Sequence, residues 1–157
     1  MKAEEEFMKE AIRLAEENIV TGNGGPFGAV IVKDGKIIAR GHNEVTSTND
    51  PTAHAEVVAI RNACRSLGTF QLEGCEIYAS CEPCPMCLGA IYWARPSKIY
   101  FAATREDAAK AGFDDSLIYT EITLDPIQRI IPCKQILHQE ALHVFHSWIM
   151  NSNKIPY

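Results

Sequence analysis

The sequence lacks the features of membrane, secreted and nucleic-acid-binding proteins. No stretch approaches the roughly 18 consecutive apolar residues of a membrane helix. The first six residues are acidic, MKAEEE, where a secretory signal would be basic and then apolar. Lys and Arg number 15 against 20 Asp and Glu, and this net charge of -5 is the wrong sign for neutralising phosphates. We therefore expect a cytoplasmic protein whose partner is a small molecule rather than a membrane or a nucleic acid.

The first half of the chain predicts two helices and a hairpin. Apolar residues recur at helical spacing over residues 7–19. Two β-rich runs follow, at 27–32 and 36–40, and the Asp34-Gly35 pair between them suits a tight antiparallel turn. Pro51 follows Asp50, a good N-cap, so we expect the second helix to begin there and to end at Gly68.

The second half predicts a parallel crossover and a helical tail. Residues 75–79 and 99–103 are short apolar strands, and the helix expected at 85–94 connects them. Residues 130–137 suggest a fifth strand and residues 140–150 a last helix. With 157 residues, 46% of them hydrophobic, the chain can form one domain, 1–157. The predicted fold class is α/β, with a mixed five-stranded sheet covered by helices.

Four residues between positions 54 and 87 carry the chemistry. His54, Cys84 and Cys87 offer one imidazole and two thiols, which is the ligand set of a catalytic zinc site with a water in the fourth position. Both thiols fall on the first turn of the expected helix, where the helix dipole favours thiolates. Glu56 lies two residues beyond His54, and both reach one metal only near a helix N-terminus. Glu56 is the candidate proton shuttle.

Other metal sites use the same residues. Cys81, Cys84 and Cys87 have the spacing of a bacterial iron–sulfur run, but Ile91 stands where the fourth cysteine belongs. A closed structural zinc site with Cys81 as fourth ligand is the stronger alternative, and it would make the chain a non-catalytic interaction module. That site leaves Glu56 without a role.

The His-x-Glu and Pro-Cys-x-x-Cys motifs resemble those of the zinc-dependent nucleobase deaminases, the cytidine deaminase-like superfamily. Within it, residues 25–30, 50–56 and 112–115 are most similar to the small bacterial guanine deaminases. The resemblance implies a three-layer α/β/α fold and one Zn²⁺ per subunit with a catalytic water. It also implies hydrolysis of guanine to xanthine and ammonia in purine salvage or catabolism, in a homodimer.

The resemblance also implies which residues contact the substrate. Phe27 would stack on the ring, Asn43 would offer an amide donor and a carbonyl acceptor, and Asp115 would accept from the N–H groups of guanine. Each has an ordinary alternative, in the core, in a turn and as a helix cap respectively. The full set of expected substrate contacts is Phe27, Asn43, Ala55, Trp93, Asp115 and Tyr157.

The substrate and the tail remain open to alternatives. A tRNA adenosine deaminase shares the zinc motif, and guanosine, cytosine or a pterin-like ring could replace guanine. Trp93 on a helix could equally belong to the core. The C-terminal tail, from about residue 138, is expected to pack on a partner subunit, with Tyr157 folding over the site. Histidines 138, 143 and 146 are expected to lie on a solvated helix face.

Overall fold

The structure is a computed structural model that describes residues 3–157, and it divides the chain into two compact units, Met1–Asp115 and Ser116–Tyr157. The first unit holds the sheet and the predicted metal residues. The second is helical. Across residues 3–157, no helix is both long enough and apolar enough to cross a membrane.

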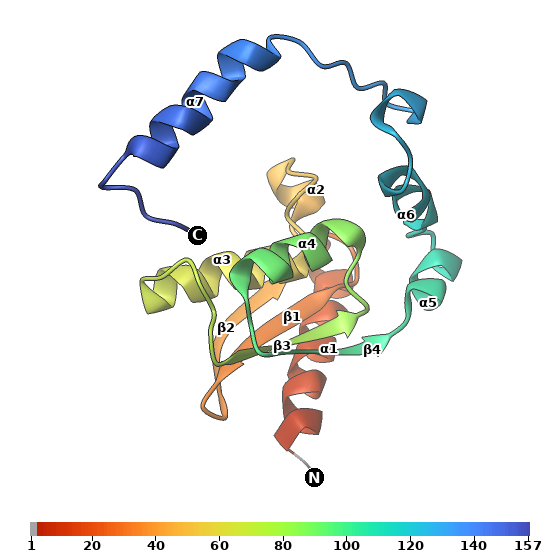
Figure 1. The fold of residues 1–157 in the computed structure, drawn as a ribbon. Coiled ribbons are helices and arrows are strands. Elements are labelled where there is room, and N and C mark those ends of the chain that lie inside the picture. The colour runs from red at the N-terminus through yellow and green to blue at the C-terminus, as the bar shows by residue number, and fades with distance from the viewer. Residues whose placement is uncertain (1–2) are drawn as a thin grey trace. The chain divides into compact units, whose positions relative to one another are not determined.

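The first unit is built on a mixed sheet in the order β2-β1-β3-β4 (Figure 1). β1 (Gly28–Lys33) and β2 (Lys36–His42) form the predicted antiparallel hairpin, and both turn residues, Asp34 and Gly35, have positive φ. β3 (Cys75–Cys81) runs antiparallel to β1 and parallel to β4 (Lys98–Ala103). The parallel crossover through α4 (Pro85–Ala94) is therefore confirmed.

One face of the sheet is covered by α1 (Ala3–Thr21), as Figure 1 shows. Leu14 of this helix packs with Val30, Val32 and Tyr78, which alternate along β1 and β3 as period-two strands require. The predicted amphipathic helix is confirmed.

The opposite face is covered by α3 (Ala55–Leu67) and α4, which completes an α/β/α arrangement. Small residues on α3, among them Ala55, Ala59 and Ala63, let the helix lie close to Ala29 and Ile31 of the sheet. Gly41 of β2 makes the closest approach, because a Cβ there would overlap the backbone of Ala55 and Ala59.

Two expectations about elements are wrong. α3 begins at Ala55 rather than Pro51, because the Asp50 carboxylate accepts hydrogen bonds from the Thr52 amide and hydroxyl and closes a local turn instead of capping a helix. It does end at Gly68, which has positive φ. A short helix, α2 (Val45–Thr48), precedes the turn.

The fifth strand is also absent, since the sheet within residues 3–157 has four strands. The Ile130 amide donates to the Glu121 carboxylate at 2.7 Å instead of joining a ladder, and Pro132 has no amide to donate. The remaining elements are α5 (Arg105–Lys110) in the first unit, and α6 (Ser116–Ile122), the 3₁₀ turn η1 (Pro126–Gln128) and α7 (His138–Met150) in the second.

Candidate metal centre and active site

The predicted metal ligands lie at the N-termini of the two helices that cover one face of the sheet. His54 is the N-cap of α3 and Cys84 is the N-cap of α4, so the later helix start moves His54 out of the helix and onto its end. Cys87 lies in the first turn of α4, and Pro85 at the first helical position fixes the chain between the two thiols. The backbone N–H groups of both helix ends favour anionic ligands.

The three side chains converge on one point. His54 Nδ1 lies 3.6 Å from Cys84 Sγ and 3.5 Å from Cys87 Sγ. In a tetrahedral site with Zn–N near 2.0 Å and Zn–S near 2.3 Å, the N and S ligands are about 3.5 Å apart. The donor set and its spacing therefore fit Zn²⁺, and three ligands leave one position open for chemistry.

The electrostatics also favour a thiolate at this point. Hydrogen bonding with Cys87 and with His54 lowers the pKa of Cys84 to about 4, against the opposing effect of burial. The same Cys84 raises the pKa of Cys87, and it raises the pKa of His54. Cys84 is thus a thiolate at neutral pH, and a cation bound here would complete the deprotonation of Cys87.

Glu56 lies in the first turn of α3 with its side chain against the metal ligands. It is 8% exposed, and its Oε2 accepts from Cys87 Sγ at 3.4 Å. Burial raises the pKa of this carboxyl group. A carboxyl group whose pKa lies closer to neutrality is better able to take up a proton and release it again at physiological pH.

Cys81 does not join the metal ligands. Its thiol donates to the Thr104 carbonyl at 3.5 Å, and burial raises the pKa of Cys81 to about 11, which keeps it protonated. Among residues 3–157 the cluster with metal-ligand spacing consists of His54, Cys84 and Cys87. The site is therefore of the open, three-ligand kind.

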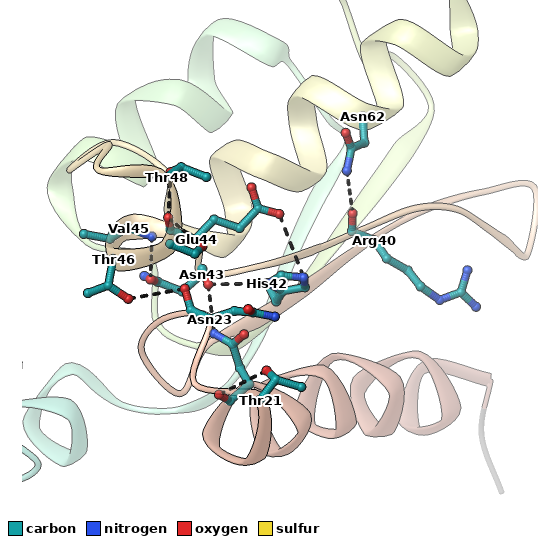
Figure 2. A network of polar contacts seen from close by, with 12 residues as sticks. Thr21, Asn23, Arg40, His42, Asn43, Glu44, Val45, Thr46, Thr48 and Asn62 are labelled. Atoms are coloured by element: carbon teal, nitrogen blue, oxygen red, sulfur yellow. Dashed lines mark hydrogen bonds and ion pairs between the residues drawn. The ribbon is translucent and has the colours of Figure 1, made fainter.

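Asn43 follows β2 and is 6% exposed. Its Oδ1 accepts from the Gly25 amide and from the Val45 amide, both at 3.1 Å; the bond to Val45 is drawn in Figure 2. The sequence led us to expect that Asn43 offers a ligand both a donor and an acceptor. In the structure two backbone amides already donate to the Oδ1 acceptor, so the side-chain nitrogen of Asn43 is the group that remains for a ligand.

Phe27 and Ala55 lie on the segments that flank the centre. Phe27 immediately precedes β1 and meets Phe113 edge-on, with ring centroids 4.9 Å apart. Its partly exposed ring is held from the side by Phe113, a residue of the 112–115 motif for which the sequence predicted no role of its own. Ala55 is buried, 1% exposed, at the start of α3 beside His54.

Asp115 lies close enough to the metal ligands to feel their charge. Burial and the neighbouring Cys84 both raise the pKa of this partly buried carboxyl group. Its contact with the substrate remains a prediction. The adjacent Asp114 is exposed.

Comparison with known proteins agrees with this centre. Residues 1–103 match the family described as the cytidine and deoxycytidylate deaminase zinc-binding region. The chain belongs to this family. Its matched region contains all three metal ligands and Glu56, so Zn²⁺ is the metal that the centre binds.

Individual relatives differ in how much of the chain they match. Guanine deaminase of Bacillus subtilis is 59% identical over 98% of both chains, and its X-ray structure superimposes with a TM-score of 0.95. The tRNA-specific adenosine deaminase of Aquifex aeolicus is 50% identical over 63% of this chain and 65% of its own. A solved structure of the Nitrosomonas europaea guanine deaminase has 35% identity and a TM-score of 0.66, covering 69% of this chain and 63% of its own.

In this deaminase, all of the expected substrate contacts remain predictions. Trp93 lies on α4 and is 64% exposed, six residues beyond the buried Cys87. Tyr157 is the last residue of the second unit. His138 at the start of α7, and His143 and His146 within it, are all exposed, as the sequence led us to expect.

Asn18 is a buried polar residue that the sequence reading missed. It lies on the inner face of α1 and is 2% exposed. Asn18 continues the helical spacing of the buried residues Ala11, Leu14 and Ala15. A single amide in this apolar stripe is the sequence feature from which its burial could have been predicted. A polar residue in such a stripe is buried with specific hydrogen-bond partners.

Proposed function

We propose that this protein catalyses the hydrolytic deamination of guanine to xanthine and ammonia. The observation that carries the proposal is the extent of the likeness to the Bacillus subtilis guanine deaminase, which covers 98% of both chains. The likeness to the Aquifex aeolicus tRNA deaminase covers about two thirds of each chain. The net charge of -5 also speaks against binding tRNA, because such binding depends on clustered cations.

The reaction replaces the 2-amino group of guanine with oxygen. His54, Cys84 and Cys87 would hold Zn²⁺, which when bound would supply a water acidified to a pKa of about 7 for attack on C2. Glu56 takes one proton from the attacking water and delivers it to the ring nitrogen. It then takes the remaining proton from the new C2 hydroxyl group and delivers it to the departing amine. The C2–O bond forms, the C2–N bond breaks, and one water is consumed for each ammonia released.

The ring is recognised by groups on its two edges and on its face. Asp115 accepts from the N1–H and 2-amino groups, which cytosine does not present in the same arrangement. The free amide nitrogen of Asn43 donates to an acceptor on the purine. Phe27 stacks on the ring, Ala55 and Trp93 line its surroundings, and Tyr157 closes over it.

One experiment distinguishes the candidate substrates. Ammonia release by the zinc-loaded protein is measured with guanine, guanosine, adenine, cytosine and a tRNA anticodon stem. We expect turnover with guanine and a loss of about 10²- to 10⁴-fold in the Glu56→Gln variant, which keeps the shape of the side chain but cannot carry the proton. Turnover of the tRNA stem in preference to guanine would refute the proposal. Full guanine turnover by Glu56→Gln would refute the proton shuttle alone.

We further propose a homodimer in which the second unit packs on the partner. α7 carries Val144, Phe145 and Trp148 at helical spacing, an apolar stripe of the kind that another surface covers. Removal of residues 155–157, which include Tyr157, should raise KM or lower kcat without changing the mass measured by light scattering. Unchanged kinetics would show that Tyr157 does not close the site.

The proposed setting is the cytoplasm, in purine salvage or catabolism. The metal thiols Cys84 and Cys87 are both free in the structure, and a reducing compartment preserves them. The proposed substrate is the free base, which purine breakdown supplies.

A further inference from the structure

The buried amide of Asn18 joins two segments that are far apart in the sequence. Its Nδ2 donates to the Gly25 carbonyl at 2.7 Å and to the Asn43 carbonyl at 2.8 Å, so one group of α1 uses both of its N–H bonds. Gly25 precedes Phe27 by two residues, and Asn43 follows β2. Both of the segments held by Asn18 therefore carry a residue of the proposed substrate site.

Further hydrogen bonds make the junction continuous around Asn18. The Gly25 amide donates to Asn43 Oδ1, and the Asn43 amide donates to the Phe27 carbonyl, each at 3.1 Å. The Phe27 amide closes a tight turn onto the Gly25 carbonyl at 2.8 Å. Figure 2 shows the surroundings of Asn43, where Val45 and the short α2 complete the network. The orientation of the Asn43 side chain is thus fixed from both sides.

The segments approach so closely that the junction tolerates little movement. A Cβ added to Gly24 would lie 2.5 Å from Asn43 Oδ1 and would also overlap the Asn43 carbonyl. Asn18 is unfavourable in a helix interior and costly to bury unless its amide is hydrogen-bonded. An apolar residue at this position would pack α1 on the sheet equally well, so packing alone does not explain the amide.

We propose that Asn18 is a positioning residue for substrate binding. It holds the turn that carries Phe27 against Asn43, and so sets the stacking ring and the amide donor at a fixed separation. Asn18 acts through these two residues and does not itself contact the substrate. The identity of the ligand in this inference rests on the proposed function. The positioning role of Asn18 rests on the hydrogen-bond network alone.

The kinetic test compares Asn18→Leu with a matched control. Asn62 also donates its Nδ2 to a carbonyl of the β2 strand, that of Arg40 at 2.9 Å, but on the exposed side of α3 (Figure 2). In zinc-loaded, folded protein, Asn18→Leu should raise KM for guanine about 10- to 100-fold and change kcat by less than about 3-fold. Asn62→Leu should leave both constants unchanged, and zinc content should be equal in all proteins.

A double variant tests whether Asn18 acts through Asn43. If it does, Asn18→Leu should reduce kcat/KM much less in an Asn43→Ala background than in the unaltered protein. Losses that multiply in full would overturn the proposal. So would an unchanged KM in Asn18→Leu, or an equal rise in KM in Asn62→Leu.

Hydrogen exchange tests the positioning without any substrate. Asn18→Leu should accelerate exchange of the Gly25 and Val45 amides, both bonded to Asn43 Oδ1, and leave Ile77 in β3 as slow as before. Unchanged protection at Gly25 would overturn the positioning role even if guanine proved to be the substrate. Faster exchange in a protein that does not deaminate guanine would refute the proposed substrate and retain the positioning role.

Discussion

The substitution Gly41→Ala is expected to damage the active site although Gly41 contacts no predicted ligand. Gly41 lies in β2 directly under α3, where a Cβ would be 2.5 Å from the Ala59 nitrogen and would overlap the Ala55 carbonyl. These are backbone atoms of a helix, and they cannot rotate away as a side chain can. The added methyl group must therefore push α3 away from the sheet.

The size of the effect follows from the contact distances. An ordinary contact begins at 3.4 Å and the contact with the Ala59 nitrogen is 2.5 Å, so α3 has to retreat by about 0.9 Å near Ala59. Overpacking of this kind costs about 1–3 kcal/mol, and the rigid neighbours favour the upper end. For a protein of this length the upper value lowers Tm by about 6–12 °C. The same retreat displaces His54 and Glu56, and a misplacement near 1 Å can reduce kcat/KM about 100-fold.

Gly89→Ala supplies the control with the opposite expected sign. Gly89 lies on the exposed side of α4, and its added Cβ would meet nothing within 4 Å outside the helix's own backbone. Alanine is favoured over glycine in a helix by about 0.5–1 kcal/mol, so Tm should rise by a few degrees. Thermal unfolding, zinc content and guanine kinetics of the two variants decide the matter. A Gly41→Ala protein with unaltered Tm and kcat/KM would refute the reasoning.

Three further predictions concern charge, metal and substrate. Arg13 and Arg40 lower the pKa of Glu10 to about 2. The ionised Glu10 carboxylate therefore stabilises the fold above pH 4.5, and this stabilisation is lost as the pH falls from about 4.5 to 2. Urea unfolding should show Glu10→Gln less stable by about 1 kcal/mol at pH 7, with the difference vanishing towards pH 2. Removal of zinc by a chelator should lower Tm, and zinc at about 100 times its Kd should restore about 2.7 kcal/mol. Asp115→Asn should raise KM for guanine by about 10-fold or more in steady-state kinetics, and an unchanged KM would exclude the proposed contact.

The metal centre could be predicted from the sequence because its chemistry is local. Cys84 and Cys87 lie on one helical turn, and His54 and Glu56 are two residues apart, so few backbone conformations bring either pair to a metal. Most helices and strands of the first unit could also be predicted from the sequence, because their apolar residues recur with the period of the local backbone. The start of α3 could not be predicted in this way. Asp50 is suited equally to an N-cap and to a local turn, and the hydrogen bond that it accepts from the Thr52 hydroxyl favours the turn.

The fifth strand and the role of Asn18 depend on contacts that no local pattern records. Residues 130–137 are as apolar as a strand, but the Glu121 carboxylate takes the Ile130 amide and leaves it unavailable to a sheet. Asn18 finds its partners 7 and 25 residues away. A sequence pattern indicates that such a residue is buried. It does not indicate what the residue binds.

The metal centre and the proposed substrate contacts are held by different parts of the first unit. The metal ligands and Glu56 are fixed by the N-termini of α3 and α4, whereas Phe27 and Asn43 are fixed to α1 on the opposite face of the sheet through Asn18. If the proposed contacts are right, we expect changes in the loops at residues 22–27 and 43–50 to alter which ring is bound while the zinc site stays intact.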